Sequence, residues 1–331
     1  MDFSIPNESE YFSTVVADWA REKLADDNAA WHHTHDLNKL GVFALLGDDA
    51  VDPENQYLNV ALVLEQLAAA GMIGPIAETI WAGAHHTTVD LPADGWVGAA
   101  LPVLRDGKSL VPYGTHTRWL IGPRTDTGPA ELVSAADLEP AYVPMSTGAA
   151  WTDGPATTLE QADNRFAWLS YAALTLGYSQ RLIDLALRQT EDRRAFGRPL
   201  LTFQAPRFAL VECYQLVSVL RTTVRDAAWR ADQNQPAATA LAAAAWLLAA
   251  DVGRRVTVNV HQVMGAASFP TETGVTPITG AMSLLRVGNG IDTAAHAVWD
   301  AWRTAAPERP SNIGGVFAKL PQTAPDEPVL I

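Results

Sequence analysis

The sequence is poor in cysteine and in positive charge, and both shortages exclude classes of protein. Its single cysteine, Cys213, leaves no internal disulfide possible and suits either a reducing cytoplasm or a place in the core. The formal net charge is -14, with 23 basic and 37 acidic residues. Nucleic-acid binding needs a dense basic face, and no stretch of the chain supplies one. The sequence therefore argues against a nucleic-acid-binding protein.

Long apolar runs and targeting segments are also missing. The longest apolar run, Ala237 to Ala250, contains Thr239, ends at Asp251 and is too short to span a bilayer. The N-terminal residues are acidic and include Pro6, which is unlike a signal or transit peptide. We therefore predict a cytoplasmic protein that does not bind membranes.

Two kinds of ligand site lack sequence support. Neither Gly-x-Gly-x-x-Gly nor a phosphate-binding Gly-Lys-Ser/Thr motif occurs, which argues against a Rossmann or P-loop nucleotide site. His32, His33 and His35 form a cluster, but neighbouring histidines in a polar loop rarely give the converging ligands that a metal ion needs. The same holds for His85 and His86. We predict no metal site.

The first half of the chain changes character once. Residues 1–92 carry helical periodicity, including a helix from Tyr57 to Ala70 that ends at Gly71, and we predict an N-terminal helical domain. Residues 93–160 carry short apolar runs separated by glycine, proline and aspartate, which predict a small β domain. These runs are Trp96 to Leu104, Arg118 to Gly122 and Glu131 to Ala135.

Residues 161–306 carry much longer helical patterns. The predicted helices run from Asn164 to about Arg194, from Phe203 to Asp232 and from Ala237 to Met264, with a fourth around Ile291 to Trp302. Long helices with short connections pack as an antiparallel bundle. Residues 307–331 are rich in proline and glycine and predict an extended or disordered tail. The expected fold class is mainly α (α+β), with an N-terminal helical domain, a reduced middle β domain and a C-terminal antiparallel four-helix bundle.

The connection between the first two long helices carries the most informative stretch, RRAFGRPLLTFQ, from Arg193 to Gln204. Gly197 and Pro199 stop the first helix, since glycine accepts a left-handed conformation and proline cannot continue the hydrogen-bond ladder. A guanidinium at Arg193 and an amide at Gln204 then lie at adjoining helix ends, where an anionic group such as a pyrophosphate can be held. On residue types alone, a surface helical hairpin with solvated arginines remains the alternative.

Two motifs, in order, resemble signatures of the acyl-CoA dehydrogenase family. The first stretch is similar to Arg-x-x-Phe-Gly-x-Pro-Leu-x-x-Phe-Gln, and Gln262 to Phe269 resembles Gln-x-x-Gly-Gly-x-Gly-Phe. In that family these positions hold the adenosine diphosphate half of an FAD whose flavin ring lies in the neighbouring subunit. The resemblance implies the same role for Arg193, Phe196, Gln204, Gln262, Gly265 and Ala266, the last of which replaces a glycine.

The carboxylate base of the resembled enzymes has no counterpart at either of its known positions. It usually stands twenty-seven residues beyond the first glutamine of the second motif, and counting from Gln262 leads to Asn289, which cannot accept a proton. Some members use a glutamate twenty-six residues before the motif arginine, where this chain has Ala167, followed by Trp168. Glu272 is the nearest carboxylate but matches a family position outside the reaction site. We therefore predict no catalytic residue.

The middle domain also departs from the resembled family. It is about half the usual size and lacks both the Thr-Glu-Pro-x-x-Gly-Ser loop and the Trp-x-Thr strand that surround the flavin. Flavin-ring contacts and base are thus missing, whereas the neighbour's share of FAD binding is kept.

Three functions remain open. The first is a non-catalytic partner subunit of a heteromeric FAD-dependent acyl-CoA dehydrogenase, similar to the α2β2 enzymes that actinobacteria use on steroid side-chain thioesters. A longer subunit would then supply the base and most of the acyl-CoA site. The second is a self-sufficient flavin dehydrogenase with a relocated base. The third is an interaction or scaffold protein with the same fold and no flavin.

Overall fold

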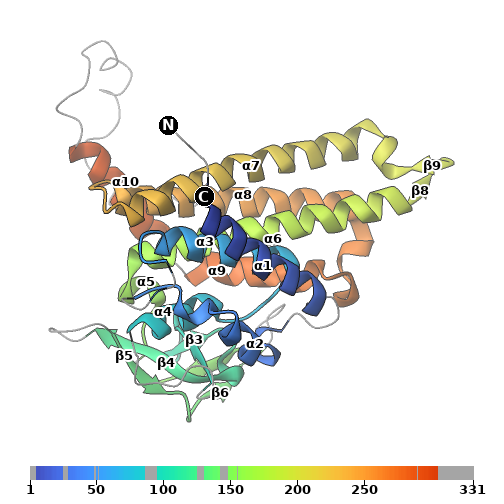
Figure 1. Ribbon diagram of the computed structural model, residues 1–331. Coiled ribbons are helices and arrows are strands. Elements are labelled where there is room, and N and C mark those ends of the chain that lie inside the picture. Colours follow the sequence, from blue (N-terminus) through green and yellow to red (C-terminus); the bar gives the residue numbers. More distant parts are fainter. Residues whose placement is uncertain are drawn as a thin grey trace.

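The computed structural model describes residues 5–24, 29–47, 50, 52–85, 95–124, 130–141, 148–154, 156–288 and 290–304. Long helices make up its upper part and small sheets lie below them (Figure 1). The predicted tail, 307–331, lies outside the described residues. The division of the chain at residues 92 and 160 stays a proposal.

The N-terminal part holds four α-helices among the described residues: α1 (Asn7–Lys23), α2 (Thr34–Lys39), α3 (Gln56–Ala70) and α4 (Ile76–His85). Apolar residues occupy most positions of α3, which is why this helix lies inside the molecule rather than on its surface. Gly71 ends it with φ 95°, a left-handed conformation that glycine adopts without strain. The prediction of this helix and of its end was correct.

Short strands form two sheets in the described part of the middle region, as the short apolar runs predicted. One sheet has the order β1-β4-β5 and comprises β1 (Trp96–Gly98), β4 (Thr117–Arg124) and β5 (Ala130–Ser134). The other has the order β2-β3-β7-β6 and comprises β2 (Leu101–Arg105), β3 (Lys108–Val111), β7 (Ala150–Thr152) and β6 (Glu139–Pro140). β1 pairs with β4 in parallel, and the other neighbours are antiparallel.

After the short helix α5 (Leu159–Ala162), three long helices form the bundle: α6 (Asn164–Asp192), α7 (Gln204–Asp232) and α8 (Ala238–Met264). Their bounds agree with the prediction to within two residues. The fold is mainly helical with small sheets, as predicted. No helix of the described ranges has both the length and the apolar character needed to cross a membrane.

The N-terminal helix α3 crosses α6 at very close range. A Cβ placed on Gly177 of α6 would overlap the backbone oxygen of Glu65, so only glycine fits at this crossing. Nearby, the buried hydroxyl of Tyr178 donates to the carbonyl of Met72 at 2.8 Å. The bundle therefore includes part of the N-terminal region in its core.

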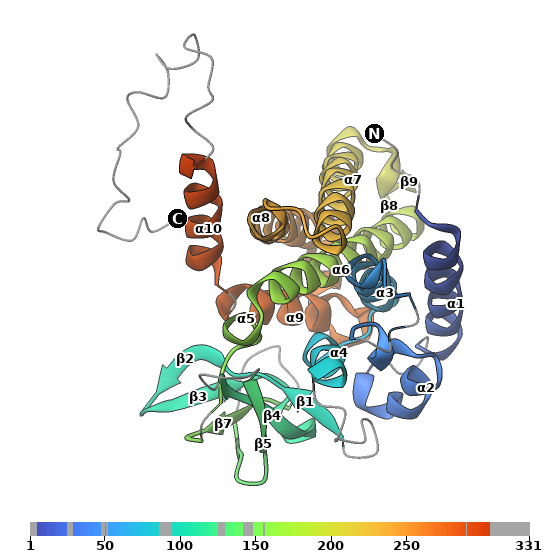
Figure 2. The ribbon, with the colours of Figure 1, turned by 60° about the vertical axis from the view of Figure 1, so that its left-hand side comes forward.

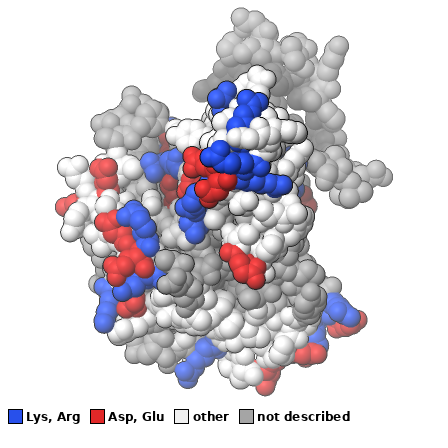
Figure 3. All heavy atoms as spheres, turned by 90° about the vertical axis from the view of Figure 1, so that its right-hand side faces the viewer, with Lys and Arg blue, Asp and Glu red and all other residues white. Residues whose placement is uncertain are grey.

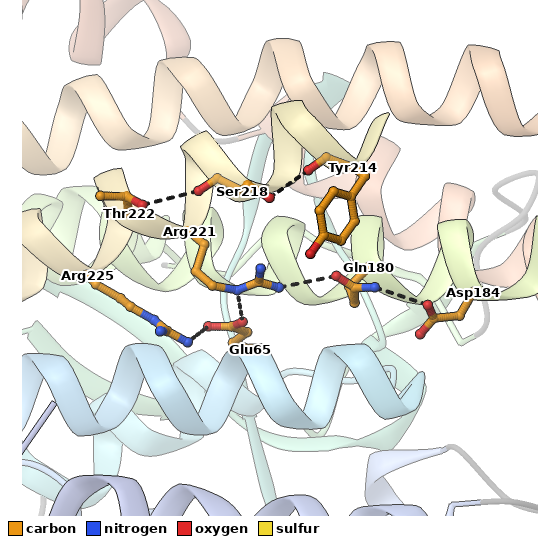
Figure 4. Close-up of polar contacts among 8 residues, drawn as sticks. All are labelled: Glu65, Gln180, Asp184, Tyr214, Ser218, Arg221, Thr222 and Arg225. Carbon is orange, nitrogen blue, oxygen red and sulfur yellow. Dashed lines mark hydrogen bonds and ion pairs between the residues drawn. The ribbon is translucent and has the colours of Figure 1, made fainter. Parts of the chain in front are cut away.

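A buried carboxylate also joins α3 to α7 (Figure 4). Glu65 is 5% exposed and accepts from Arg221 Nε at 2.8 Å and from Arg225 Nη2 at 3.2 Å. Arg221 Nη2 continues to Gln180 Oε1 on α6 at 3.2 Å. The three helices thus share one polar network within an otherwise apolar interface.

Two further helices follow the bundle. The predicted fourth helix is present as α10 (Ile291–Thr304), which packs against α8 and stands to one side of the bundle in Figure 2. Helix α9 (Val275–Gly288), which contacts α6, was not predicted from the sequence. The single cysteine, Cys213, is fully buried, as its core interpretation required.

Candidate functional site

The first motif forms a protruding hairpin between α6 and α7. Strands β8 (Arg194–Ala195) and β9 (Arg198–Pro199) pair across the two residues Phe196 and Gly197, whose φ angles are 53° and 80°. Two successive positive φ angles define a type I′ turn, in which the first residue is strained unless it is Gly, Asn or Asp. Phe196 is nevertheless 96% exposed, so its ring buries almost no surface in this chain. A strained, exposed aromatic side chain is typical of a group that contacts something outside its own chain.

The residues that follow the turn hold the hairpin against α7. The ring of Phe203 contacts Phe196 edge-on, with centroids 6.2 Å apart, and Arg198 lies over its face at 4.2 Å. Gln204 is exposed and begins α7, where no side chain caps the first backbone N–H groups. An open helix N-terminus with an adjacent amide can bind an anion.

The second motif ends α8. Gly265 has φ 60° and ψ -138°, a conformation that other residues avoid, whereas Ala266 has no positive φ and is compatible with its methyl group. Gln262 and Ala266 are exposed. The replacement of the family's second glycine by Ala266 therefore introduces no backbone strain.

The fold brings the two motifs together through Arg193. Its Nη1 donates to the carbonyl of Met264 at 3.3 Å, and a Cβ on Gly265 would lie 3.9 Å from the same nitrogen. This contact has a structural explanation, since a cation at a helix C-terminus offsets the exposed carbonyls of α8. The guanidinium keeps further N–H donors beyond that bond, so one helix-capping bond does not exhaust Arg193.

Two further predicted site residues, Gln204 and Gln262, are exposed at the start of α7 and near the end of α8. In the described ranges, the side-chain amides of Gln204 and Gln262 have no hydrogen-bond partner. Amide and guanidinium N–H groups donate to phosphate oxygens, so these residues fit the ADP half of a dinucleotide. Arg193, Phe196, Gln204, Gln262 and Ala266 are all exposed, so a ligand bound to them would need a second surface to enclose it.

The local charge supports an anionic ligand. The stretch 191–207 contains four arginines and two acidic residues, although the whole chain carries a net charge of -14. Figure 3 faces this end of the bundle, and its basic side chains gather in the upper half with acidic ones among them. The stretch 191–207 is therefore locally basic within an acidic chain.

The base positions offer no proton acceptor. Ala167 and Trp168 are fully buried, and Asn289 lies outside the described residues. Glu272 is exposed in a single helical turn of Thr271–Thr273. No predicted position thus supplies a carboxylate in a dry pocket.

A carboxylate that the sequence did not single out stands near these positions. A Cβ on Gly290, the residue after Asn289, would overlap the carboxylate of Glu160. Burial raises the pKa of Glu160 above its usual value, and the side chains of Thr293 and Trp168 partly offset this effect. Gly290 directly precedes α10, so the carboxylate of Glu160 lies at the N-terminus of that helix. It therefore also has a structural role, because a negative charge stabilises a helix N-terminus. No sequence motif identified Glu160.

A second such carboxylate, Glu78, lines a cavity between the helices and the sheets. Burial raises the pKa of Glu78 to about 7. A hydrogen bond from its own backbone N–H has the opposite but smaller effect on this pKa. Three tyrosines, Tyr113, Tyr171 and Tyr178, line the same cavity, whose volume is about 30 Å³. Ligand pockets measure roughly 300–1,000 Å³, so this space admits a water molecule or two and no flavin ring or acyl chain.

Among the described residues, no group of three or more histidine, cysteine, aspartate or glutamate side chains is placed to hold a metal ion. The ring of His32 contacts Trp31 and that of His33 contacts Trp19, and Trp31 stacks on His116 at 3.8 Å. This cluster is aromatic packing around η1 (Ala30–His32).

Comparison with known proteins finds a sequence similarity that is confined to the C-terminal helices. Residues 164–296 match the family model described as acyl-CoA dehydrogenase, C-terminal domain. The probable acyl-CoA dehydrogenase YngJ of Bacillus subtilis (strain 168) is 33% identical over 122 residues, which make up 37% of this chain and 32% of that protein. The match thus spans about a third of the curated relative's length.

Solved structures resemble nearly the whole chain. A chain of the ChsE4-ChsE5 complex from Mycobacterium tuberculosis has a TM-score of 0.67 at 19% identity, over 94% of this chain and 100% of that one. PigA, solved with FAD and proline, has a TM-score of 0.65 at 17% identity, over 92% of this chain and 99% of that one. At such identities the likeness shows the fold alone. The chain has the fold of the acyl-CoA dehydrogenases, and its residues 164–296 are similar to the C-terminal domain of that family.

Proposed function

We propose that this chain is a non-catalytic partner subunit of a heteromeric, FAD-dependent acyl-CoA dehydrogenase. Its C-terminal bundle would supply the ADP half of an FAD site, and a longer subunit would supply the flavin pocket, the base and most of the acyl-CoA site. The expected assembly is α2β2 and cytoplasmic. A bulky acyl thioester, such as a steroid side-chain thioester, is the expected substrate.

One contrast within the chain carries this proposal. The bundle end presents Arg193 beside Gly265 and a strained, exposed Phe196, while the cavity between helices and sheets measures about 30 Å³. A self-sufficient dehydrogenase needs both an oxidant and a substrate beside its base. This chain would keep the surface that serves a neighbour's cofactor, and its described cavity between the helices and the sheets is too small for a flavin ring.

The residues have separate roles towards the cofactor. Arg193 would pair with a pyrophosphate oxygen through the guanidinium donors that Met264 does not use. The amides of Gln204 and Gln262 would add neutral hydrogen bonds, and Phe196 would cover an apolar part of the cofactor or of the partner. FAD, when bound, supplies the hydride acceptor. Nothing in this chain would remove the substrate's proton.

Two of the solved structures support the quaternary and cofactor parts of the proposal. The neighbour from Mycobacterium tuberculosis was solved as a complex of two differently named proteins, which is compatible with a heteromer. PigA was solved with FAD, which supports FAD as a cofactor of this fold. For this chain, both the heteromer and the shared FAD are proposals.

A relocated base is the second candidate function, and the Glu160 contact with Gly290 favours it. In that case Glu160 would abstract the substrate's proton at the turn where the family places its base. A hollow of about 490 Å³ lined by Glu160, Trp81 and His85 also favours it, whereas the cavity beside Glu78 measures only about 30 Å³. A Glu160→Gln variant separates the two: turnover of the complex should be unchanged under the first proposal and abolished under the second.

The direct test is co-expression with a longer acyl-CoA dehydrogenase subunit of the same genome. We expect a yellow complex that oxidises an acyl-CoA, and a colourless, inactive chain when it is purified alone. Stoichiometric FAD and turnover in the lone chain would overturn the proposal. A stable complex without flavin would instead support the scaffold function.

A further inference from the structure

The loop after α8 carries a serine where the second motif of the family has its last glycine. Ser268 is fully buried, and its hydroxyl donates to the carbonyl of Gly265 at 2.8 Å. The same hydroxyl oxygen lies 2.8 Å from Nδ1 of His261. A hydroxyl has one proton, which here goes to Gly265, so Nδ1 of His261 must be the protonated donor.

The result is a directed chain of two hydrogen bonds, from His261 through Ser268 to Gly265. It begins one turn before the end of α8 and returns to the residue that ends the helix. Thr276 adds to the loop, because its hydroxyl oxygen lies 2.9 Å from the carbonyl of Phe269 and 3.2 Å from that of Ser268 and its one proton lies between these two acceptors. A glycine at position 268 could make none of the hydroxyl's contacts.

The peptide that this chain of hydrogen bonds holds adjoins the one that Arg193 contacts. Arg193 Nη1 donates to the carbonyl of Met264, and Ser268 donates to the next carbonyl, that of Gly265. Gly265 has φ 60° and ψ -138°, a conformation that glycine reaches readily because it has no Cβ. For the same reason its backbone has more conformational freedom than that of other residues. Fixing its carbonyl removes that freedom beside the guanidinium.

We propose that His261 and Ser268 are positioning residues of the FAD site in this chain, which hold the Gly265 peptide and, through Met264, the direction of Arg193. This inference rests on the proposed function. Neither residue has to touch the cofactor. A pre-ordered loop binds more tightly because less conformational entropy is lost when the ligand arrives.

The protonation state of His261 suits this role. Burial lowers its pKa below the usual value, and its ring lies 5.6 Å from that of Phe269. The neutral tautomer with a proton on Nδ1 makes the bond to Ser268, so the chain of hydrogen bonds exists at neutral pH.

The experiment compares FAD release on dilution of the purified complex between this chain and the longer subunit. His261→Phe and Ser268→Ala each break the chain of hydrogen bonds, and each should raise the FAD dissociation constant about fivefold. The double variant should be no worse than either single one, because both remove the same chain. His261→Asn places an amide N–H near the position of Nδ1 and should stay within about twofold of the wild type.

His35→Phe, at an exposed position of α2, is the matched control and should retain FAD as the wild type does. A thermal unfolding midpoint for every variant identifies a purely structural role, which would lower the midpoint without changing FAD affinity. Wild-type retention in His261→Phe, or a loss in His261→Asn as large as in His261→Phe, would overturn the inference while the proposed function stands. Absence of FAD from the wild-type complex would overturn both.

Discussion

Glu78 gives the clearest quantitative prediction, because its carboxyl is buried in a cavity too small to solvate it. Its pKa is about 7 in the folded chain against 4.5 for the unperturbed group. Three tyrosine side chains and no cation line the described part of that cavity. The folded state therefore binds a proton more tightly than the unfolded state does.

The sign of the pH dependence follows from linkage. Between pH 4.5 and 7 the folded chain holds a proton that the unfolded chain has released, so stability falls as pH rises. Each pKa unit corresponds to about 1.4 kcal/mol, so the loss due to Glu78 is about 3 kcal/mol and is complete above pH 7. Glu78→Gln keeps the shape and removes the titration.

We expect Glu78→Gln to match the wild type near pH 4.5 and to exceed it by about 3 kcal/mol at pH 8. In a chain of this size that is a rise in the midpoint of thermal unfolding of about 4 °C. The assay is thermal unfolding of both proteins over this pH range, with Glu272→Gln, at an exposed position, as control. A difference that is constant with pH, or a wild type that is the more stable at pH 8, would refute the reasoning.

Three further variants test the cofactor site, the bundle and the missing base. Arg193→Ala should weaken FAD retention in the complex by about ten- to a hundredfold with the fold intact, since it removes a charge-assisted pair but no core packing. Arg198→Ala is the control and should weaken it much less. Flavin released on dilution of the complex measures both. Glu65→Ala leaves two half-buried arginines facing each other and should cost about 3 kcal/mol in urea unfolding, and an unchanged midpoint would show that the network contributes nothing. Asn289→Glu should create no thioester oxidation in a complex whose own base has been removed, and any gain in turnover would reveal a complete reaction pocket in this chain.

The helices of the bundle were predictable because they are long and strongly periodic. Apolar positions recur along α7 at helical spacing, and Gly197 and Pro199 fixed the break before it. The approach of Arg193 to Gly265 could be expected only from the family resemblance, because they are far apart in sequence. Residue types and spacing alone left a solvated hairpin as the alternative.

The two carboxylates found only in the structure had no sequence signal. Glu78 lies in the first turn of α4, where an acidic residue is ordinary, and its burial depends on the packing of α6, α9 and the sheets against that helix. Glu160 became a candidate only because the fold places its carboxylate against Gly290, which is distant in sequence. The helix α9 was missed because proline and glycine interrupt its pattern, at Pro277 and Gly280.

The central claim is that this chain completes an FAD site only together with another subunit. The measurement is the flavin absorbance per protein of the chain purified alone and of the complex co-purified with a longer acyl-CoA dehydrogenase subunit. We expect no flavin in the lone chain, bound FAD in the complex, and a lower flavin content in the complex that carries Arg193→Ala. Full flavin content in the lone chain, or in the Arg193→Ala complex, would contradict the central claim.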